Sequence, residues 1–222
     1  GSGTGTITND DMPYTPIHAI QGSGSESPYK NQTVTTRGIV TARKSNGYFI
    51  QSRELLYDED PDTSEGLQVF TSTAPPSQIV VGADVVVTGT VSEYIPTADS
   101  YSPPLTELTG STVNAVLYTG VTMPTPVTLT AADTPPSGAL EQLEKYEGML
   151  VEIFSLTTIS PTQGSISEAN ATATSNGTFY GVITGIIRPA REPGIAAPEP
   201  IPDPPCCIPR FDGNPERLRV DT

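Results

Sequence analysis

Short runs of alternating hydrophobic and polar residues fill the chain from residue 32 to 110, and turn residues separate these runs. Two of them, Thr33–Ala42 and Ala83–Tyr94, are rich in Val, Ile and Thr, which favour β-strands. Each carries one glycine in its middle, Gly38 or Gly89. A glycine inside a strand is typical of a place where the strand bends sharply. The pattern therefore predicts long strands that curve around a small barrel.

Turn residues divide this region into five strands. The Asn46-Gly47 pair predicts a tight hairpin turn, an acidic segment predicts a loop, and two adjacent prolines at 75–76 predict a connection. The expected strands are Thr33–Ala42, Tyr48–Ser52, Leu67–Ser72, Ala83–Tyr94 and Leu105–Val113. We therefore predict an all-β fold in which residues 14–118 form a five-stranded barrel.

Alternation also indicates which side of a strand faces the core. On the fourth strand the buried face is expected to carry Val85, Val87 and Val91. The second strand is ambiguous, because its inner pair is either Tyr48 with Ile50 or Phe49 with Gln51. A short apolar segment before the first strand, residues 16–21, is expected to add an edge strand or to cap the barrel.

Several basic and several aromatic residues occur together between residues 37 and 70. Stacking aromatics beside cations are the combination that single-stranded nucleic acid requires. The candidate nucleic-acid-binding residues are Arg37, Arg43, Lys44, Tyr48, Phe49 and Phe70. For each aromatic residue the alternative is an ordinary position in the barrel core.

The acidic loop carries three aspartates at alternate positions, Asp58, Asp60 and Asp62. Alternate carboxylates on a tight loop can converge on a hard cation such as Ca²⁺, so we consider a calcium site here. The spacing departs from an EF-hand loop, because Thr63 stands where that loop requires glycine. The alternative is a solvated loop in which Thr63 and Ser64 cap a turn.

The character of the chain changes after the barrel, and residues 119–222 are expected to form a second, smaller β module. It begins with a connector and one short helix, Gly138–Tyr146, and either forms another OB-like barrel or adds strands to a shared sheet. Its expected strands are Met149–Ile159, Ile166–Ala173, Thr178–Ile187 and Glu216–Val220. A proline-dense stretch, Arg188–Pro209, is expected to lie extended over the surface.

Composition limits the chemistry of the chain. Its formal net charge of −14 opposes strong nucleic-acid binding, since phosphate contacts need Lys and Arg, of which there are 11. The two cysteines, Cys206 and Cys207, are adjacent and cannot close a loop. The single histidine, His18, has no nucleophile with an orienting carboxylate near it in sequence. With no paired catalytic carboxylates beside a base and no phosphate loop, we predict a chain that is not an enzyme by itself.

Several blocks of sequence resemble the oligonucleotide/oligosaccharide-binding (OB-fold) module of bacterial extracellular nucleases. In order, they are IHAIQGSG, VTTRGIVTARKSNGYFIQS, DEDPDTSEGLQVF, VVGADVVVTGTVSEY and TELTG. They cover roughly the first half of the chain, and the resembled family carries a similar Asp-rich loop. In that family this region precedes a metal-dependent endonuclease/exonuclease/phosphatase-type domain.

The resemblance implies a non-catalytic accessory module of a secreted nuclease. Such a module binds nucleic acid, with single-stranded DNA favoured, or positions a catalytic nuclease domain in the same polypeptide. High Thr, Ser and Pro content also favours secretion, and no apolar run is long enough to cross a bilayer. The alternative is a structural module of an extracellular protein that contacts proteins or glycans, because OB-folds bind many kinds of ligand.

Overall fold

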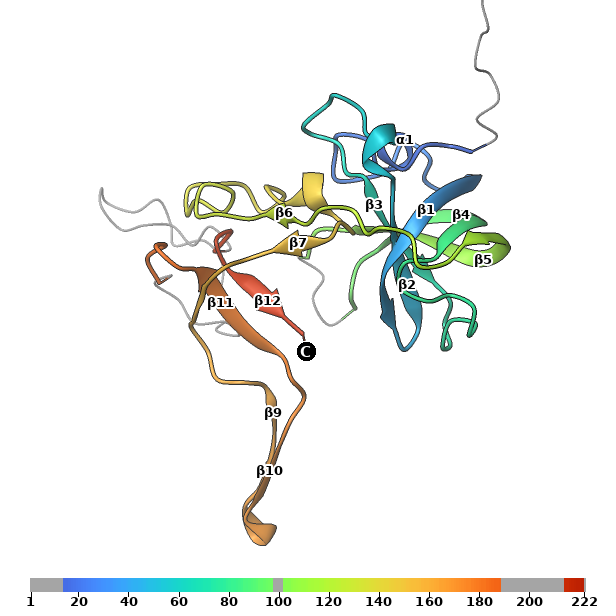
Figure 1. Ribbon diagram of the computed structural model, residues 1–222. Coiled ribbons are helices and arrows are strands. Elements are labelled where there is room, and N and C mark those ends of the chain that lie inside the picture. The colour runs from blue at the N-terminus through green and yellow to red at the C-terminus, as the bar shows by residue number, and fades with distance from the viewer. Residues whose placement is uncertain (1–13, 98–101, 189–213, 222) are drawn as a thin grey trace, which may run out of the picture. The chain divides into compact units, whose positions relative to one another are not determined.

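The computed structural model describes residues 14–97, 102–188 and 214–221. Its contacts divide the chain into two compact units. The first unit comprises Gly1–Val127 with Glu144–Val151, and the second comprises Thr128–Leu143 with Glu152–Thr222. Strands dominate both units, as predicted, and the described residues contain one short α-helix (Figure 1).

Five strands of the first unit form one sheet that closes on itself in the order β1-β2-β3-β5-β4. They are β1 (Thr33–Lys44), β2 (Gly47–Gln51), β3 (Gly66–Phe70), β4 (Asp84–Tyr94) and β5 (Leu105–Tyr118). The sheet is mixed, because β3 and β5 run parallel while the other neighbours are antiparallel. All five strands lie where the sequence pattern predicts them.

The bend of β1 closes the sheet. Residues Thr33–Ile39 pair with β4, and residues Ile39–Lys44 pair with β2, so the strand changes partner at Ile39. The preceding residue is Gly38, where a Cβ atom would lie 3.0 Å from the Cβ of Ile50. A side chain at this bend would push the neighbouring strand away by a few tenths of an ångström, which favours glycine here.

The interior of the closed sheet is filled by aliphatic side chains and one tyrosine. Each strand contributes alternate residues, as the strand period of two requires. The core includes Val34, Val40, Tyr48, Ile50, Leu67, Val69, Val85, Val87, Val91 and Leu108. The predicted inner face of the fourth strand is confirmed, and on β2 the inner pair is Tyr48 with Ile50.

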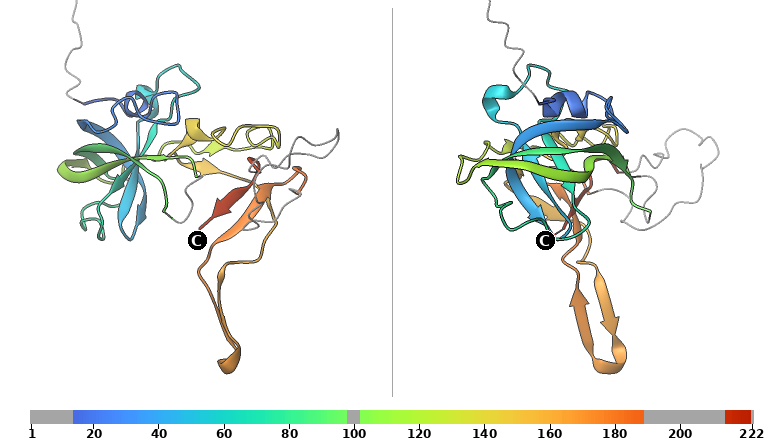
Figure 2. Two further views of the ribbon diagram at one scale, coloured as in Figure 1. Left: turned by 180° about the vertical axis from the view of Figure 1, so that it is seen from behind. Right: turned by 90° about the vertical axis from the view of Figure 1, so that its right-hand side faces the viewer.

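Helix α1 (Ile17–Gln21) covers one end of the closed sheet, so the apolar segment before β1 is a cap and not an edge strand (Figures 1 and 2). Its Ile17 and Ile20 side chains are completely or almost completely buried in the same core. The helix contacts β1 and β3.

The helix predicted over Gly138–Tyr146 is absent. Residues 140–143 form a turn, and a 3₁₀ turn, η2 (Glu144–Tyr146), follows it. The backbone N–H groups of Gly138, Gln142 and Glu147 bond to carbonyls three residues earlier, which is 3₁₀ geometry and not α-helical geometry. A nine-residue segment with glycine at its start is too short to hold a helix by itself, so local contacts decide its form.

The second unit contains two small sheets. One is three-stranded, in the order β12-β11-β8, and comprises β8 (Leu156–Thr158), β11 (Phe179–Ile183) and β12 (Leu218–Val220). The other is a hairpin of β9 (Gly164–Ser167) and β10 (Thr172–Ser175), which extends away from the three-stranded sheet (Figure 2). The single strand predicted over Ile166–Ala173 is thus wrong, because the 3₁₀ turn η3 (Glu168–Asn170) reverses the chain within it.

Three further elements complete the described chain. These are η1 (Glu54–Leu56), β6 (Val127–Thr128) and β7 (Val151–Glu152), of which β6 and β7 pair with each other. Cys206, Cys207 and most of the proline-dense stretch lie outside the described residues. Within the described residues, no helix has the length and apolarity needed to span a membrane.

Candidate nucleic-acid interface

The outer face of β2 and β3 carries the aromatic residues that remain available to a ligand. Phe49 points outward between Tyr48 and Ile50, and its side chain is half-buried. Phe70 lies on the same face at the end of β3 and is also half-buried. Tyr48 does not belong to this surface, because its side chain is completely buried in the core. Of the three predicted aromatics, Phe49 and Phe70 can therefore stack on a ligand.

Lys44 lies beside Phe49 at the end of β1. Its Nζ atom is 5.6 Å from the centre of the Phe49 ring, within the range of a cation–π contact. The same ammonium group donates a hydrogen bond of 3.2 Å to Oε1 of Gln68 on β3. This arrangement places one cation and one aromatic ring side by side on an outer surface.

A carboxylate lies next to this pair. Gln68 donates a 2.7 Å hydrogen bond to Oε2 of Glu107, whose strand β5 runs parallel to β3. Burial raises the pKa of Glu107, although Gln68 and Lys44 act in the opposite direction. Sequence reasoning missed Gln68 and Glu107. Alternation within GLQVF places Gln68 on the face of Phe70, but only the pairing of β3 with β5 brings Glu107 to it.

Arg37 is held on a different part of the closed sheet. Its Nε and Nη2 atoms donate to the two carboxylate oxygens of Asp84, at 2.9 and 2.7 Å. Arg53 also donates to Asp84, whose side chain is completely buried. The net effect of the two arginines is to lower the pKa of Asp84, although burial alone would raise it. Arg37 therefore balances a buried charge, a role that takes it away from the predicted binding surface.

Arg43 is exposed near the end of β1, and its Nη2 atom donates a 3.0 Å hydrogen bond to the carbonyl of Pro75. In the pairing of β1 with β2, Arg43 lies opposite the inward Tyr48, so it is on the other face of the sheet from Phe49. Of the three predicted cations, Lys44 is the one that the structure places beside Phe49. In the described part of the chain, no ion pair involves Arg43 or Lys44.

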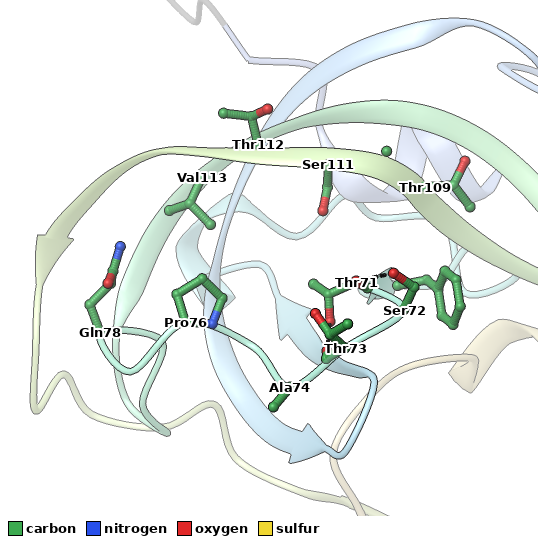
Figure 3. Close-up of a pocket in the computed structure, with 12 residues that line it drawn as sticks. Thr71, Ser72, Thr73, Ala74, Pro76, Gln78, Thr109, Ser111, Thr112 and Val113 are labelled. Carbon is green, nitrogen blue, oxygen red and sulfur yellow. Dashed lines mark hydrogen bonds between the residues drawn. The ribbon is translucent and has the colours of Figure 1, made fainter.

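An open hollow of about 630 Å³ begins at Phe70. It lies between the loop that follows β3 and the middle of β5, and Figure 3 shows Ser111 and Val113 directed toward that loop. Six Ser and Thr side chains line it, with no charged side chain. Its chemistry suits a neutral hydroxylated group better than a phosphate.

The three aspartates of the acidic loop do not converge on one point. The carboxylate of Asp58 accepts hydrogen bonds from the backbone N–H of Asp60 and from the hydroxyl of Thr63, at 3.2 and 2.9 Å. Asp60 in turn accepts from the backbone N–H of Asp62, at 3.0 Å. These are successive Asx turns, so the carboxylates of Asp58 and Asp60 hold the loop in shape.

Comparison of the chain with family models, with curated proteins and with solved structures finds no match in any of the three.

Proposed function

We propose that this chain is the non-catalytic accessory module of a secreted nuclease and that the outer face of β2 and β3 binds single-stranded DNA. The strand order supports an OB-fold, in which a five-stranded Greek-key barrel presents its second and third strands to oligonucleotides. The parallel pairing of β3 with β5 and the closure of β1 onto β4 agree with that assignment.

The observation that carries the proposal is the position of Lys44 beside the outward Phe49, with Phe70 on the same face. Base stacking on an aromatic side chain contributes about 1–3 kcal/mol per base and tolerates any sequence. The ammonium group adds an attraction for the backbone phosphate. Together they provide the two contacts from which non-specific single-strand binding is built.

The affinity is expected to be low. The chain has a net charge of −14, and Glu107 adds a carboxylate to the binding face. With Lys44 as the one cation beside Phe49, the logarithm of the binding constant should fall with the logarithm of salt concentration at a slope of about −0.7. Affinity should therefore drop about 2.5-fold between 50 and 200 mM salt.

The test is the double substitution Arg43→Ala with Lys44→Ala, measured by fluorescence anisotropy on a labelled oligothymidine at several salt concentrations. Both the affinity and the salt slope should fall, because the phosphate contacts are removed. The matched control is Arg217→Ala with Arg219→Ala in the second unit, which removes the same charge and should reduce neither the stacking contact nor the salt slope. If the control loses as much affinity as the test variant, the attraction is diffuse and the assigned face is wrong.

A second candidate function is recognition of an oligosaccharide in the hollow beside Phe70. The uncharged, hydroxyl-rich lining favours it, and the hollow belongs to the same closed sheet. A glycan bound there should be insensitive to salt, unlike DNA. A glycan array read at 50 and 500 mM salt separates the two candidates, and Ser111→Tyr, which would fill the hollow, should abolish only the glycan signal.

The accessory role implies that the chain does not cleave DNA by itself. Purified chain incubated with plasmid and with single-stranded DNA should leave both intact in Mg²⁺, Mn²⁺ or Ca²⁺. Cleavage that a point substitution within this chain abolishes would refute the non-catalytic assignment.

A further inference from the structure

Three side chains with metal-binding chemistry meet where α1 contacts the start of β3. They are His18 from the helix, Asp58 from the acidic loop and Glu65 from the residue before β3. One ligand atom from each lies within 4.8 Å of the others. Nδ1 of His18 is 2.9 Å from Oε1 of Glu65, and Nε2 is 3.9 Å from Oδ2 of Asp58. The cluster lies outside the proposed DNA-binding face.

Hydrogen bonds around the cluster hold each of the three groups in place. Gln21 donates a 2.6 Å bond to the carbonyl of Gly66, which fixes α1 against β3. The backbone N–H of Asp58 donates to Oε1 of Glu65 at 3.0 Å, and Thr63 donates to the carboxylate of Asp58. Such supporting bonds are typical of groups that ligate metals.

One carboxylate oxygen of Glu65 is buried without a hydrogen-bond partner in the described part of the chain. This oxygen is Oε2, and the side chain of Glu65 is only 5 % exposed. A buried carboxylate oxygen without a partner is costly. The contact with His18 uses Oε1 of Glu65 and leaves Oε2 of Glu65 without a partner. A cation bound to the Glu65 carboxylate would supply a partner for Oε2.

We propose that His18, Asp58 and Glu65 bind one divalent transition-metal ion of the zinc class. One imidazole with two carboxylates is a donor set that zinc accepts, with the remaining position open to water. Calcium is disfavoured, because it takes six to eight oxygen ligands and rarely a ring nitrogen. Asp60 and Asp62, which the sequence suggested for calcium, do not belong to the set. His18 would bind the metal through a ring nitrogen that carries no proton.

The test uses the fact that His18 is the only histidine in the chain. The protein is prepared with Cys206→Ser and Cys207→Ser, since thiols also bind zinc. Imidazole nitrogen resonances are followed by NMR during titration with ZnCl₂, with CaCl₂ and MgCl₂ as comparisons. We expect saturation at one equivalent of zinc, a large shift of one ring nitrogen, and a rise in melting temperature.

The variants are His18→Gln and Asp58→Asn, and the matched control is Asp60→Asn with Asp62→Asn. The first two should weaken zinc binding at least tenfold, while the control should bind as the parent does. Asp58 is 29 % exposed, so its variant remains informative if His18→Gln fails to fold. Ring resonances that stay unchanged at excess zinc, or zinc binding that Asp58→Asn leaves intact, would overturn the proposal. None of these measurements involves DNA, so their failure leaves the proposed function untouched.

Discussion

At the scale of single residues, Tyr48 shows how much the position of a side chain matters. Its ring fills the core of the closed sheet, but its hydroxyl is buried without a hydrogen-bond partner among the described residues. Burial also raises the pKa of this hydroxyl, so it stays protonated. A polar atom in this position costs free energy that the ring itself does not.

Tyr48→Phe should therefore increase the free energy of unfolding, by about 1 kcal/mol. The control is Tyr57→Phe, because the Tyr57 hydroxyl accepts a 2.6 Å hydrogen bond from the buried Gln51 and its loss should destabilise the protein. Urea unfolding followed by circular dichroism compares the two. A loss of stability in Tyr48→Phe would mean that the hydroxyl has a partner such as a buried water.

Glu107 is the residue at which charge opposes the proposed function. Glu107→Gln removes a negative charge beside Lys44 while keeping a group that can contact Gln68. Affinity for single-stranded DNA should rise about two- to fivefold, the effect of roughly 0.5–1 kcal/mol for one charge near the surface. Anisotropy titrations at low salt measure it, and an unchanged or weaker affinity would place the DNA away from this face.

At the scale of elements, residues 147–150 lie against the start of β3 although they are far from it in sequence. Leu150 donates a 2.8 Å bond from its backbone N–H to Gln51, and Ser64 donates to the carbonyl of Glu147 at 2.6 Å. The approach is closest at Gly66, where a Cβ atom would lie 2.2 Å from the carbonyl carbon of Gly148. A glycine at the start of β3 is thus what permits this backbone contact.

Gly66→Ala should destabilise the first unit by about 1–3 kcal/mol, because backbone has to move to make room for the methyl group. Gly24→Ala is the control: Gly24 is exposed, has no atom within 4 Å of an added Cβ, and should change stability by less than about 0.5 kcal/mol. Hydrogen exchange of the Leu150 backbone amide, which donates to Gln51, should become faster in Gly66→Ala if the contact with residues 147–150 is lost. Equal stability of both variants would show that residues 147–150 do not pack on β3.

Over the whole molecule, acidic residues outnumber basic ones by 25 to 11. One of the acidic residues, Glu147, makes the stability of the protein depend on pH. Burial, followed by the nearby Glu144, raises the pKa of Glu147 to about 8 from its ordinary value of 4.5. Its carboxyl accepts hydrogen bonds from Thr106 and Gln21, so it links three separate segments of the first unit. The native protein therefore holds a proton that the unfolded chain releases.

The contribution of Glu147 to stability is fully present below about pH 4.5 and is lost as the pH rises toward 8. The unfolding free energy should fall by up to about 1.4 kcal/mol per pH unit in this range. Asp84 does not interfere, because its lowered pKa makes it titrate at more acidic pH. Glu147→Gln should flatten the profile measured by denaturation at pH 5, 6.5 and 8. An identical slope in the variant would show that Glu147 ionises normally in the native protein.

The positions of the five strands of the closed sheet and the bend of β1 can be predicted from the sequence. Alternation of apolar residues and the position of Gly38 are local properties, and they survive in any fold that buries one face of each strand. The same reasoning identified the buried face of β4. The same reasoning could not identify the buried face of β2. Each of its two possible inner pairs contains an apolar residue, so Tyr48 with Ile50 and Phe49 with Gln51 fit the strand period equally well.

The contacts between charged and polar groups could not be predicted in this way, because they depend on the tertiary structure. The sequence assigned Arg37 to the binding surface because it lies among basic and aromatic residues, yet it bonds to Asp84, which is 47 residues away. The contact of Gln68 with Glu107 depends on the parallel pairing of β3 with β5, and the contact of His18 with Glu65 depends on how α1 caps the closed sheet. Contacts of this kind depend on the path of the chain in space. A local pattern of residues does not contain this information, because the period of a strand specifies which face a residue lies on and not which strand is its neighbour.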